Sequence, residues 1–255
     1  MLSRHVPTQN YLLAALHATS YARLLPWLEH LWMPSGLVLQ SSDEPDYIYF
    51  PTSSIISLMC VMENGDSSAV ASVGNEGLVG ISFLMGGQSN STLAVVHSAG
   101  SGYRIRASIV KREFERHGDF QELVIRYARA HMGHMAQTAA CNRHHSVNQQ
   151  LSCWLLLTLD RLQSNEVVIT QGLIASFLGV HRERVTAAAN KFQTEKMIQC
   201  GRGRIHVLDR SRLEKRACEC YTAIKKQFAF LWSPLHDLIQ MPGEAPHRIL
   251  TSPKK

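Results

Sequence analysis

The pattern of apolar and polar positions changes twice along the chain. The first residues have helical spacing, with apolar runs at Tyr11–Leu16 and Leu24–Leu31. From Gly36 to Arg106, short β-type runs alternate with Gly, Asn, Asp and Ser, and Asn64-Gly65 between two runs indicates a hairpin. The rest of the chain returns to helical spacing. This order predicts an α+β protein with an N-terminal β-roll of the jelly-roll type.

One long helix is expected from Phe120 to Asn142. A stripe of apolar residues follows it at alternating spacings of three and four, as in a coiled-coil seam. A second apolar set in its first half lies on another side, so the helix can pack on its own domain and still meet a partner. We interpret it as a dimerisation helix; the alternative is a helix buried within one subunit. The seam residues are Ile125, Ala128, Met132, Met135 and Ala139.

A helix-turn-helix is predicted after a further helix at Val147–Gln163. Thr170 is a favourable N-cap residue, and Gly179 can adopt the left-handed conformation that ends a helix. A second short helix begins near His181 and carries a single apolar stripe, which leaves its opposite face to solvent. Two short helices joined by a glycine turn are typical of a helix-turn-helix.

The outward face of the second short helix has the side chains of a recognition helix. Arginine suits guanine, glutamate suits cytosine, and threonine or alanine suits the thymine methyl group in the major groove. A merely solvated helix start is the alternative. The candidate DNA-binding residues of the two helices are Thr170, Gln171, His181, Arg182, Glu183, Arg184, Thr186, Ala187, Asn190 and Lys191.

A basic hairpin is predicted directly after this helix. Two strand-like runs flank Gly201-Arg202-Gly203, whose glycines permit a tight turn that directs a cation outward. We expect Arg202 and Arg204 to contact the sugar-phosphate backbone. Ser211 to Glu214 then fits a capping box that opens the last helix. Helix, glycine turn, basic helix and basic hairpin in this order predict a winged helix-turn-helix that binds duplex DNA.

Charge is distributed unevenly along the chain, which has a formal net charge of +6. Residues 181–226 contain 12 Lys/Arg and 5 Asp/Glu, a net charge of +7, whereas residues 1–150 contain 10 and 11, a net charge of −1. A focused basic patch on an otherwise neutral protein favours a polyanionic partner. A solvated basic face would give the same count, so charge alone leaves both interpretations open.

No apolar run approaches the ~18 residues that cross a bilayer, and the N-terminal residues lack the features of a signal peptide. We therefore expect a cytoplasmic protein with reduced thiols and no membrane partner. Cys218-x-Cys220 is a poor zinc signature, and no metal site is expected there. The expected segments are 1–118 (N-terminal helices and β-roll sensor domain), 119–145 (dimerisation helix), 146–232 (winged helix-turn-helix) and 233–255 (C-terminal tail).

Several motifs of the chain together match one known family. They are Thr170-Gln171, Ala175, Leu178-Gly179-Val180, Arg182-Glu183, Val185 and Gly201-Arg202-Gly203, with Gly36–Leu39, Asp46–Pro51 and Glu76–Gly80 upstream. On these motifs, from about Gly36 to Tyr221, the chain resembles the Crp/Fnr superfamily of bacterial transcription regulators. The resemblance implies a cyclic-nucleotide-binding-like β-roll, a homodimer, a palindromic DNA operator and RNA polymerase as a partner.

The chain departs from the cyclic-AMP-binding members at the phosphate pocket. Those members have a Glu after the glycine turn and an Arg further on, where this chain has Ile81-Ser82 and Ser91-Thr92. Burying a phosphate without a partner charge is costly, so we expect no binding of cyclic AMP in the usual manner and no cofactor. The N-terminal cysteines of the iron–sulfur members are also absent, and Ala187 stands where many members carry a second arginine. The candidate effector pocket is Gly77, Gly80, Ile81, Ser82, Ser91 and Thr92.

Other interpretations stay open. A ligand-binding β-roll module whose basic C-terminal region binds RNA or another polyanion would show the same charge pattern. A cupin-like enzyme would need a metal cluster on the strands, but residues 36–106 contain one histidine, His97, and we predict no enzymatic activity. A group near the seam could share a metal or respond to pH, or consist of ordinary polar positions. This group is His131, His134, Cys141, His144 and His145.

Overall fold

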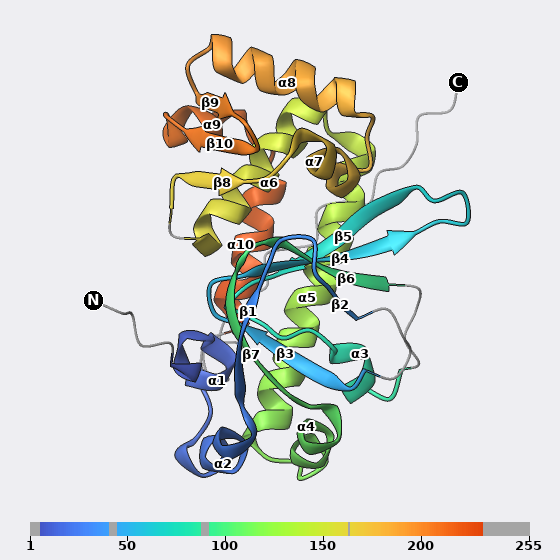
Figure 1. Ribbon diagram of the computed structural model, residues 1–255, viewed down its shortest axis with the longest axis vertical. Helices are drawn as coiled ribbons and strands as arrows, with labels where there is room; N and C mark the ends of the chain where they lie inside the picture. The colour runs from blue at the N-terminus through green and yellow to red at the C-terminus, as the bar shows by residue number, and fades with distance from the viewer. Residues whose placement is uncertain (1–5, 41–44, 88–91, 163, 232–255) are drawn as a thin grey trace, which may run out of the picture.

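The computed structural model describes residues 6–40, 45–87, 92–162 and 164–231. Figure 1 shows an elongated molecule with short N-terminal helices at one end, a β-roll in the middle and a mainly helical domain at the other end. Antiparallel sheets come first along the chain and most helices follow them, which confirms the α+β prediction. Ser91 and the predicted tail over 233–255 lie outside the described residues.

The strands of the β-roll are β1 (Glu29–Met33), β2 (Val38–Gln40), β3 (Tyr47–Pro51), β4 (Ile55–Val61), β5 (Ser67–Val73), β6 (Thr92–Ser98) and β7 (Gly100–Arg106). They form two antiparallel sheets with the orders β1-β7-β3 and β2-β6-β4-β5. Buried side chains such as Met33, Ile56 and Val96 fill the space between the sheets. The predicted hairpin is present, and Gly65 in its turn has a φ of +86°.

The short helices that flank the roll are α1 (Tyr11–Ala14), α2 (Ala18–Leu24), α3 (Ile81–Leu84) and α4 (Ala107–Phe114). The expected helical run over Leu24–Leu31 is wrong. After a 3-10 turn at Leu25–Trp27 the chain enters β1. Pro26 has no N–H with which to extend a helix, and β1 pairs along its full length with β7. Sheet pairing therefore overrides the helical spacing of this segment.

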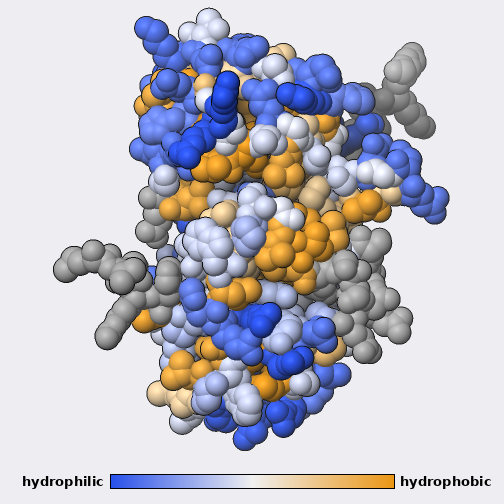
Figure 2. Space-filling view, viewed as in Figure 1, coloured by the Kyte–Doolittle hydropathy of each residue, from blue (hydrophilic) through white to orange (hydrophobic). Residues whose placement is uncertain are grey.

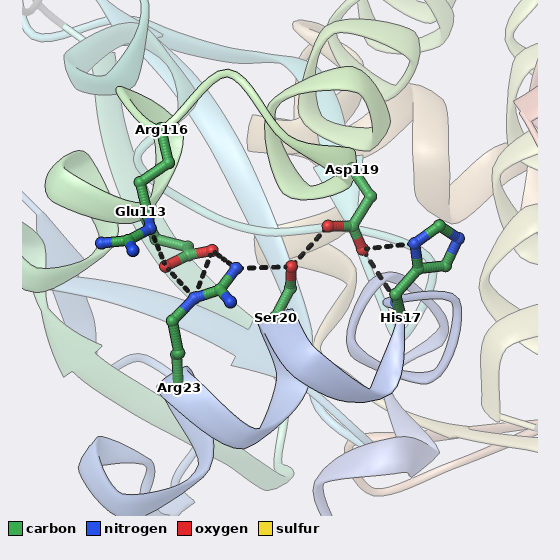
Figure 3. Close-up of polar contacts among 6 residues, drawn as sticks. All are labelled: His17, Ser20, Arg23, Glu113, Arg116 and Asp119. Carbon is green, nitrogen blue, oxygen red and sulfur yellow. Dashed lines mark hydrogen bonds and ion pairs between the residues drawn. The ribbon is translucent and has the colours of Figure 1, made fainter.

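A polar cluster fastens α2 to α4 and to the beginning of the long helix (Figure 3). The Arg23 guanidinium donates to the Glu113 carboxylate at 2.6 Å from Nη2 and 2.9 Å from Nε. The Ser20 hydroxyl donates to Asp119, the first residue of the long helix. Only 7% of the Glu113 side chain is exposed, so its charge needs this partner. The cluster fixes where the long helix leaves the roll.

The predicted long helix is α5 (Asp119–His144), with 26 residues and a length of about 39 Å at 1.5 Å per residue. Its second apolar set, which includes Phe120, Val124 and Tyr127, is buried against the roll. A later helix, α10 (Cys220–Leu231), packs along it. The long helix therefore connects both ends of the molecule (Figure 1).

The C-terminal domain has the predicted winged helix-turn-helix. Its elements are α6 (Val147–Leu162), β8 (Glu166–Val168), α7 (Gln171–Leu178), α8 (Arg182–Thr194), β9 (Ile198–Gly201), β10 (Arg204–Val207) and α9 (Arg210–Arg216). The sheet order is β8-β10-β9. Helices and sheet share one core, in which Ile174, Phe192 and Ile205 are buried.

The predicted capping box at Ser211–Glu214 is wrong. The N-cap of α9 is Asp209, whose carboxylate accepts the backbone N–H of Arg212 at 2.9 Å. An aspartate at this position also faces the positive end of the helix dipole. The helix therefore begins at Arg210, and Ser211 lies inside its first turn.

Across the described ranges, none of the helices combines the length and the apolar character that a membrane span requires.

Candidate nucleic-acid interface

The first helix of the motif is fixed at both ends by the residues expected from the sequence. The Thr170 hydroxyl accepts the backbone N–H of Leu173 at 3.2 Å and caps α7. Gly179 ends the helix in the left-handed region, with a φ of 63°. The buried side chains of Ile174 and Phe177 hold α7 against the domain core.

The second helix, α8, buries one stripe and exposes the opposite face, as predicted. Val185, Ala189 and Phe192 lie in the core and are fully buried. The inward stripe leaves the start of the helix projecting into solvent, and Figure 2 shows hydrophilic side chains gathered over this end of the molecule. The predicted contact residues of α8 that are exposed are His181, Arg182, Glu183, Arg184, Ala187, Asn190 and Lys191.

Two of the predicted DNA-contact residues, Gln171 and Thr186, form a hydrogen bond with each other. The Thr186 hydroxyl lies 2.8 Å from the Gln171 side-chain oxygen, to which it donates, and both residues are half-buried. This hydrogen bond joins the start of α7 to the middle of α8. Because of it, Gln171 and Thr186 have less freedom to contact a base than the exposed residues around them.

The predicted basic hairpin is the β9–β10 pair, whose turn contains Gly203 with a φ of 65°. Arg202 is exposed at its tip. Arg204 donates to Glu166 of β8 at 2.8 Å, with 61% and 38% of the two side chains exposed. Sequence reasoning missed β8 and this partner, although Glu166-Val-Val-Ile169 is a short β-type run. Arg202 is therefore the more available cation of the hairpin.

The β4–β5 hairpin of the roll lies beside the helix-turn-helix. A Cβ placed on Gly179 would lie 3.1 Å from the Ser68 side chain, so roll and turn touch closely. A cleft of about 940 Å³ separates the hairpin from the start of α8, with Asp66 on one side and Arg182 and Arg184 on the other. The β4–β5 hairpin thus borders the predicted contact face.

In the candidate effector pocket, the backbone of Gly77 packs closely against Tyr127. A Cβ on Gly77 would overlap the Tyr127 hydroxyl, which donates to the Leu78 carbonyl at 3.3 Å. A nearby cation, Arg161, is already paired with Glu76 at 2.8 Å. The other described candidates lie nearby in the sequence or on β6. Gly80 is the N-cap of α3, Ile81 and Ser82 are its first two residues, and Thr92 is the first residue of β6.

Four of the five seam residues are exposed, and the fifth is not. Met132 is 67% exposed, Ile125 48% and Met135 37%, and Ala139 is also exposed. Ala128 is buried within the chain and so offers little surface to a partner. Large apolar side chains exposed in a row on one helix mark a surface that a partner can cover.

The histidine and cysteine group near the seam does not come together as one cluster. His131 and His134 are buried, contrary to their interpretation as polar helix positions, and burial lowers the pKa of His131 to about 4. His144 is exposed. Cys141 and His145 instead meet Cys218 and Cys220, the pair for which no site was expected.

Comparison with known proteins agrees with this geometry. Residues 149–216 match the family model of the Crp-like helix-turn-helix domain. No curated protein matches the chain.

Several solved structures share the fold at low identity. A regulator from Eubacterium rectale, described as belonging to the crp/fnr family, has a TM-score of 0.65 and 18% identity, covering 82% of this chain and 98% of that one. FixK2 from Bradyrhizobium japonicum has a TM-score of 0.61 and 16% identity over 75% and 98%. The c-di-GMP-responsive regulator CLP from Xanthomonas campestris has a TM-score of 0.56 and 14% identity over 75% and 99%.

The structural likeness extends over 74–84% of this chain in such comparisons, and the family match covers most of the C-terminal domain. The chain therefore shares its fold with these regulators, and residues 149–216 belong to the Crp-like helix-turn-helix domain family.

Proposed function

We propose that the chain is a homodimeric transcription regulator that binds a palindromic duplex DNA operator through α8 and the β9–β10 wing. The observation that carries this proposal is the exposed, cationic start of α8 beside an exposed basic hairpin. A helix of this kind fits the major groove, where Arg182 and Glu183 can read guanine and cytosine. The proposal places the chain in the cytoplasm and, by analogy with the family, beside RNA polymerase.

The dimer in this proposal forms along α5. Ile125, Met132 and Met135 are exposed on the flank of α5 that the roll does not cover. Two copies of this flank can pack as a two-helix seam. A twofold dimer presents two copies of α8, which is why the expected operator is palindromic.

Control by cyclic AMP in the usual manner is not part of the proposal. Gly77 in the turn that would hold the phosphate packs closely against Tyr127, and Arg161 nearby is neutralised by Glu76. An incoming anion that used Arg161 would have to break this buried ion pair. Other small molecules are left open, and we infer no catalytic activity.

Selection of bound DNA from a random duplex pool tests the function. We expect the full chain to enrich a palindromic site, and Arg182→Ala to relax base preference at one position per half-site by about 1–3 kcal/mol. Arg112→Ala, which removes an exposed cation on α4 far along the chain from the motif, should leave the selected site unchanged.

Two outcomes would contradict the proposal. A selected-site profile that is identical for the full chain and Arg182→Ala would exclude α8 as the recognition helix. Retention of single-stranded RNA in preference to duplex DNA would favour the alternative of a β-roll module with an RNA-binding basic region.

A further inference from the structure

The fold brings four potential metal ligands together at the junction between α5 and α10. Cys141 is in the last turn of α5, and His145 is the C-cap of that helix. Cys218 precedes α10 and Cys220 is its first residue. The four ligand atoms all lie within 4.8 Å of one another. His145 and Cys220 are 75 positions apart in the sequence. In the sequence, Cys141 with His145 and Cys218 with Cys220 therefore look like two unrelated pairs.

The distances within this group match a tetrahedral site. The Sγ atoms of Cys141 and Cys218 are 3.6 Å apart, and the Cys220 Sγ is 3.4 Å from the His145 Nδ1. Zinc–sulfur bonds of about 2.3 Å and zinc–nitrogen bonds of about 2.0 Å give tetrahedral edges of about 3.8 Å and 3.5 Å. A disulfide would need about 2.05 Å between the sulfurs, and all these cysteines are free.

The surroundings orient the imidazole as metal-bound histidines are oriented. While Nδ1 faces the sulfurs, Nε2 lies 3.3 Å from the Glu219 carboxylate. A carboxylate behind the histidine is a common outer partner in zinc sites. The Gln137 amide donates to the Cys220 Sγ at 3.0 Å, a hydrogen bond that stabilises a thiolate. Glu219 and Gln137, which are not ligands themselves, therefore support two of the four ligand side chains.

Access and ligand type both suit a closed structural site. Cys141 and Cys218 are each 6% exposed and Cys220 is fully buried, whereas 18% of the His145 side chain is exposed and gives an entry path. Three thiolates and one imidazole select zinc over magnesium or calcium. Four protein ligands leave no open position for catalysis.

We propose that Cys141, His145, Cys218 and Cys220 bind one zinc ion per chain. The ion joins the end of α5 to the start of α10, and so fixes the last helix of the C-terminal domain to the long helix. This proposal does not depend on the identity of the DNA operator.

Metal titration of the full chain tests the site. The chain is purified with reductant, stripped with a chelator and titrated with cobalt(II). We expect one equivalent to bind with a thiolate-to-cobalt charge-transfer band and the ligand-field bands of tetrahedral cobalt, and zinc to displace it. Cys218→Ser and Cys220→Ser should lose this spectrum. Glu219→Gln should weaken the affinity by about 10- to 100-fold.

The matched controls are Cys60→Ser and Cys200→Ser, which alter half-buried cysteines outside the group and should bind as the unchanged chain does. Thermal unfolding gives a second readout, because zinc should raise the Tm of the unchanged chain and not that of a correctly folded Cys218→Ser variant. The proposal is overturned if the unchanged chain takes up no stoichiometric metal, if the cobalt spectrum lacks thiolate bands, or if Cys60→Ser loses as much affinity as Cys218→Ser.

Discussion

At the scale of single residues, the arginines of the C-terminal domain have different surroundings. Arg202 projects from a glycine turn, Arg204 shares its charge with Glu166, and Arg210 is held by Asp160 and Glu214. Formal charge counts treat them alike. Only arginines without an acidic partner are free to neutralise DNA phosphates and so release the counterions bound to the DNA. The basic segment therefore offers fewer cations to DNA than its net charge suggests.

Arg202 should therefore contribute affinity without sequence preference. We expect Arg202→Ala to weaken binding to all duplexes alike and to lower the salt slope by about 1. The check is the binding constant measured over a range of salt concentrations for a selected site and for a random duplex. Arg112→Ala is the control. A loss confined to the selected site would contradict the wing assignment.

Buried histidines make the fold sensitive to acid. His97 is fully buried between Trp154 and Phe177, and its Nδ1 lies 2.8 Å from the Ser57 hydroxyl. Burial, together with the charge of Arg161, lowers its pKa to about 3. The folded state therefore excludes a proton that His97 in the unfolded chain binds below about pH 6.5.

The stabilisation from neutral His97 is present above pH 6.5 and is lost as the pH falls toward 3. Below pH 6.5, the contribution of His97 to the free energy of unfolding should decrease by about 1 kcal/mol for each unit by which the pH falls. Urea unfolding at pH 7 and pH 5 measures it, and His97→Gln should reduce the difference. The exposed His206→Gln is the control. Equal pH dependence of all three chains would show that His97 titrates normally.

At the scale of elements, patterns within one helix or hairpin are predictable because their causes are local. The turn at Gly65, the αL residue Gly179 and the inward stripe of α8 all follow from neighbouring residues. β1 and β8 were missed because each is held by strands far away in sequence. The site formed by Cys218 and Cys220 depends on α5 in the same way, so spacing alone could not reveal it.

The exposed flank of α5 yields a prediction about assembly. Met132→Glu should disfavour the dimer, because two carboxylates would be buried in the seam without partners. Ala22→Glu adds the same charge at an exposed position of α2, outside the seam, and is the control. Sedimentation measures the mass. A dimer that survives Met132→Glu at the concentration at which the unchanged chain is dimeric would exclude this seam.

At the scale of the whole molecule, the roll and the C-terminal domain are joined by a buried ion pair. Arg161 of α6 donates to Glu76 of the roll at 2.9 Å from Nε, and the side chains are 8% and 10% exposed. Removing one partner of such a pair leaves an uncompensated charge. The pair is therefore an energetic link between the two halves.

Arg161→Met should lower the free energy of unfolding by about 3–5 kcal/mol. Arg204→Met breaks a solvent-exposed pair with Glu166 and should cost less than about 1 kcal/mol. Urea unfolding compares the two, and adding Glu76→Gln to Arg161→Met should restore part of the loss. Similar small effects of both single substitutions would show that the link contributes little.

The contact of His97 on β6 with Trp154 and Phe177 has a practical consequence. These aromatic rings belong to different halves of the chain, yet each covers the other from water. A fragment that begins at residue 146 would carry Trp154 and Phe177 with one side uncovered, and would be prone to self-association. The C-terminal half is thus a poor candidate for expression as an isolated fragment, and experiments on it need the β-roll half attached.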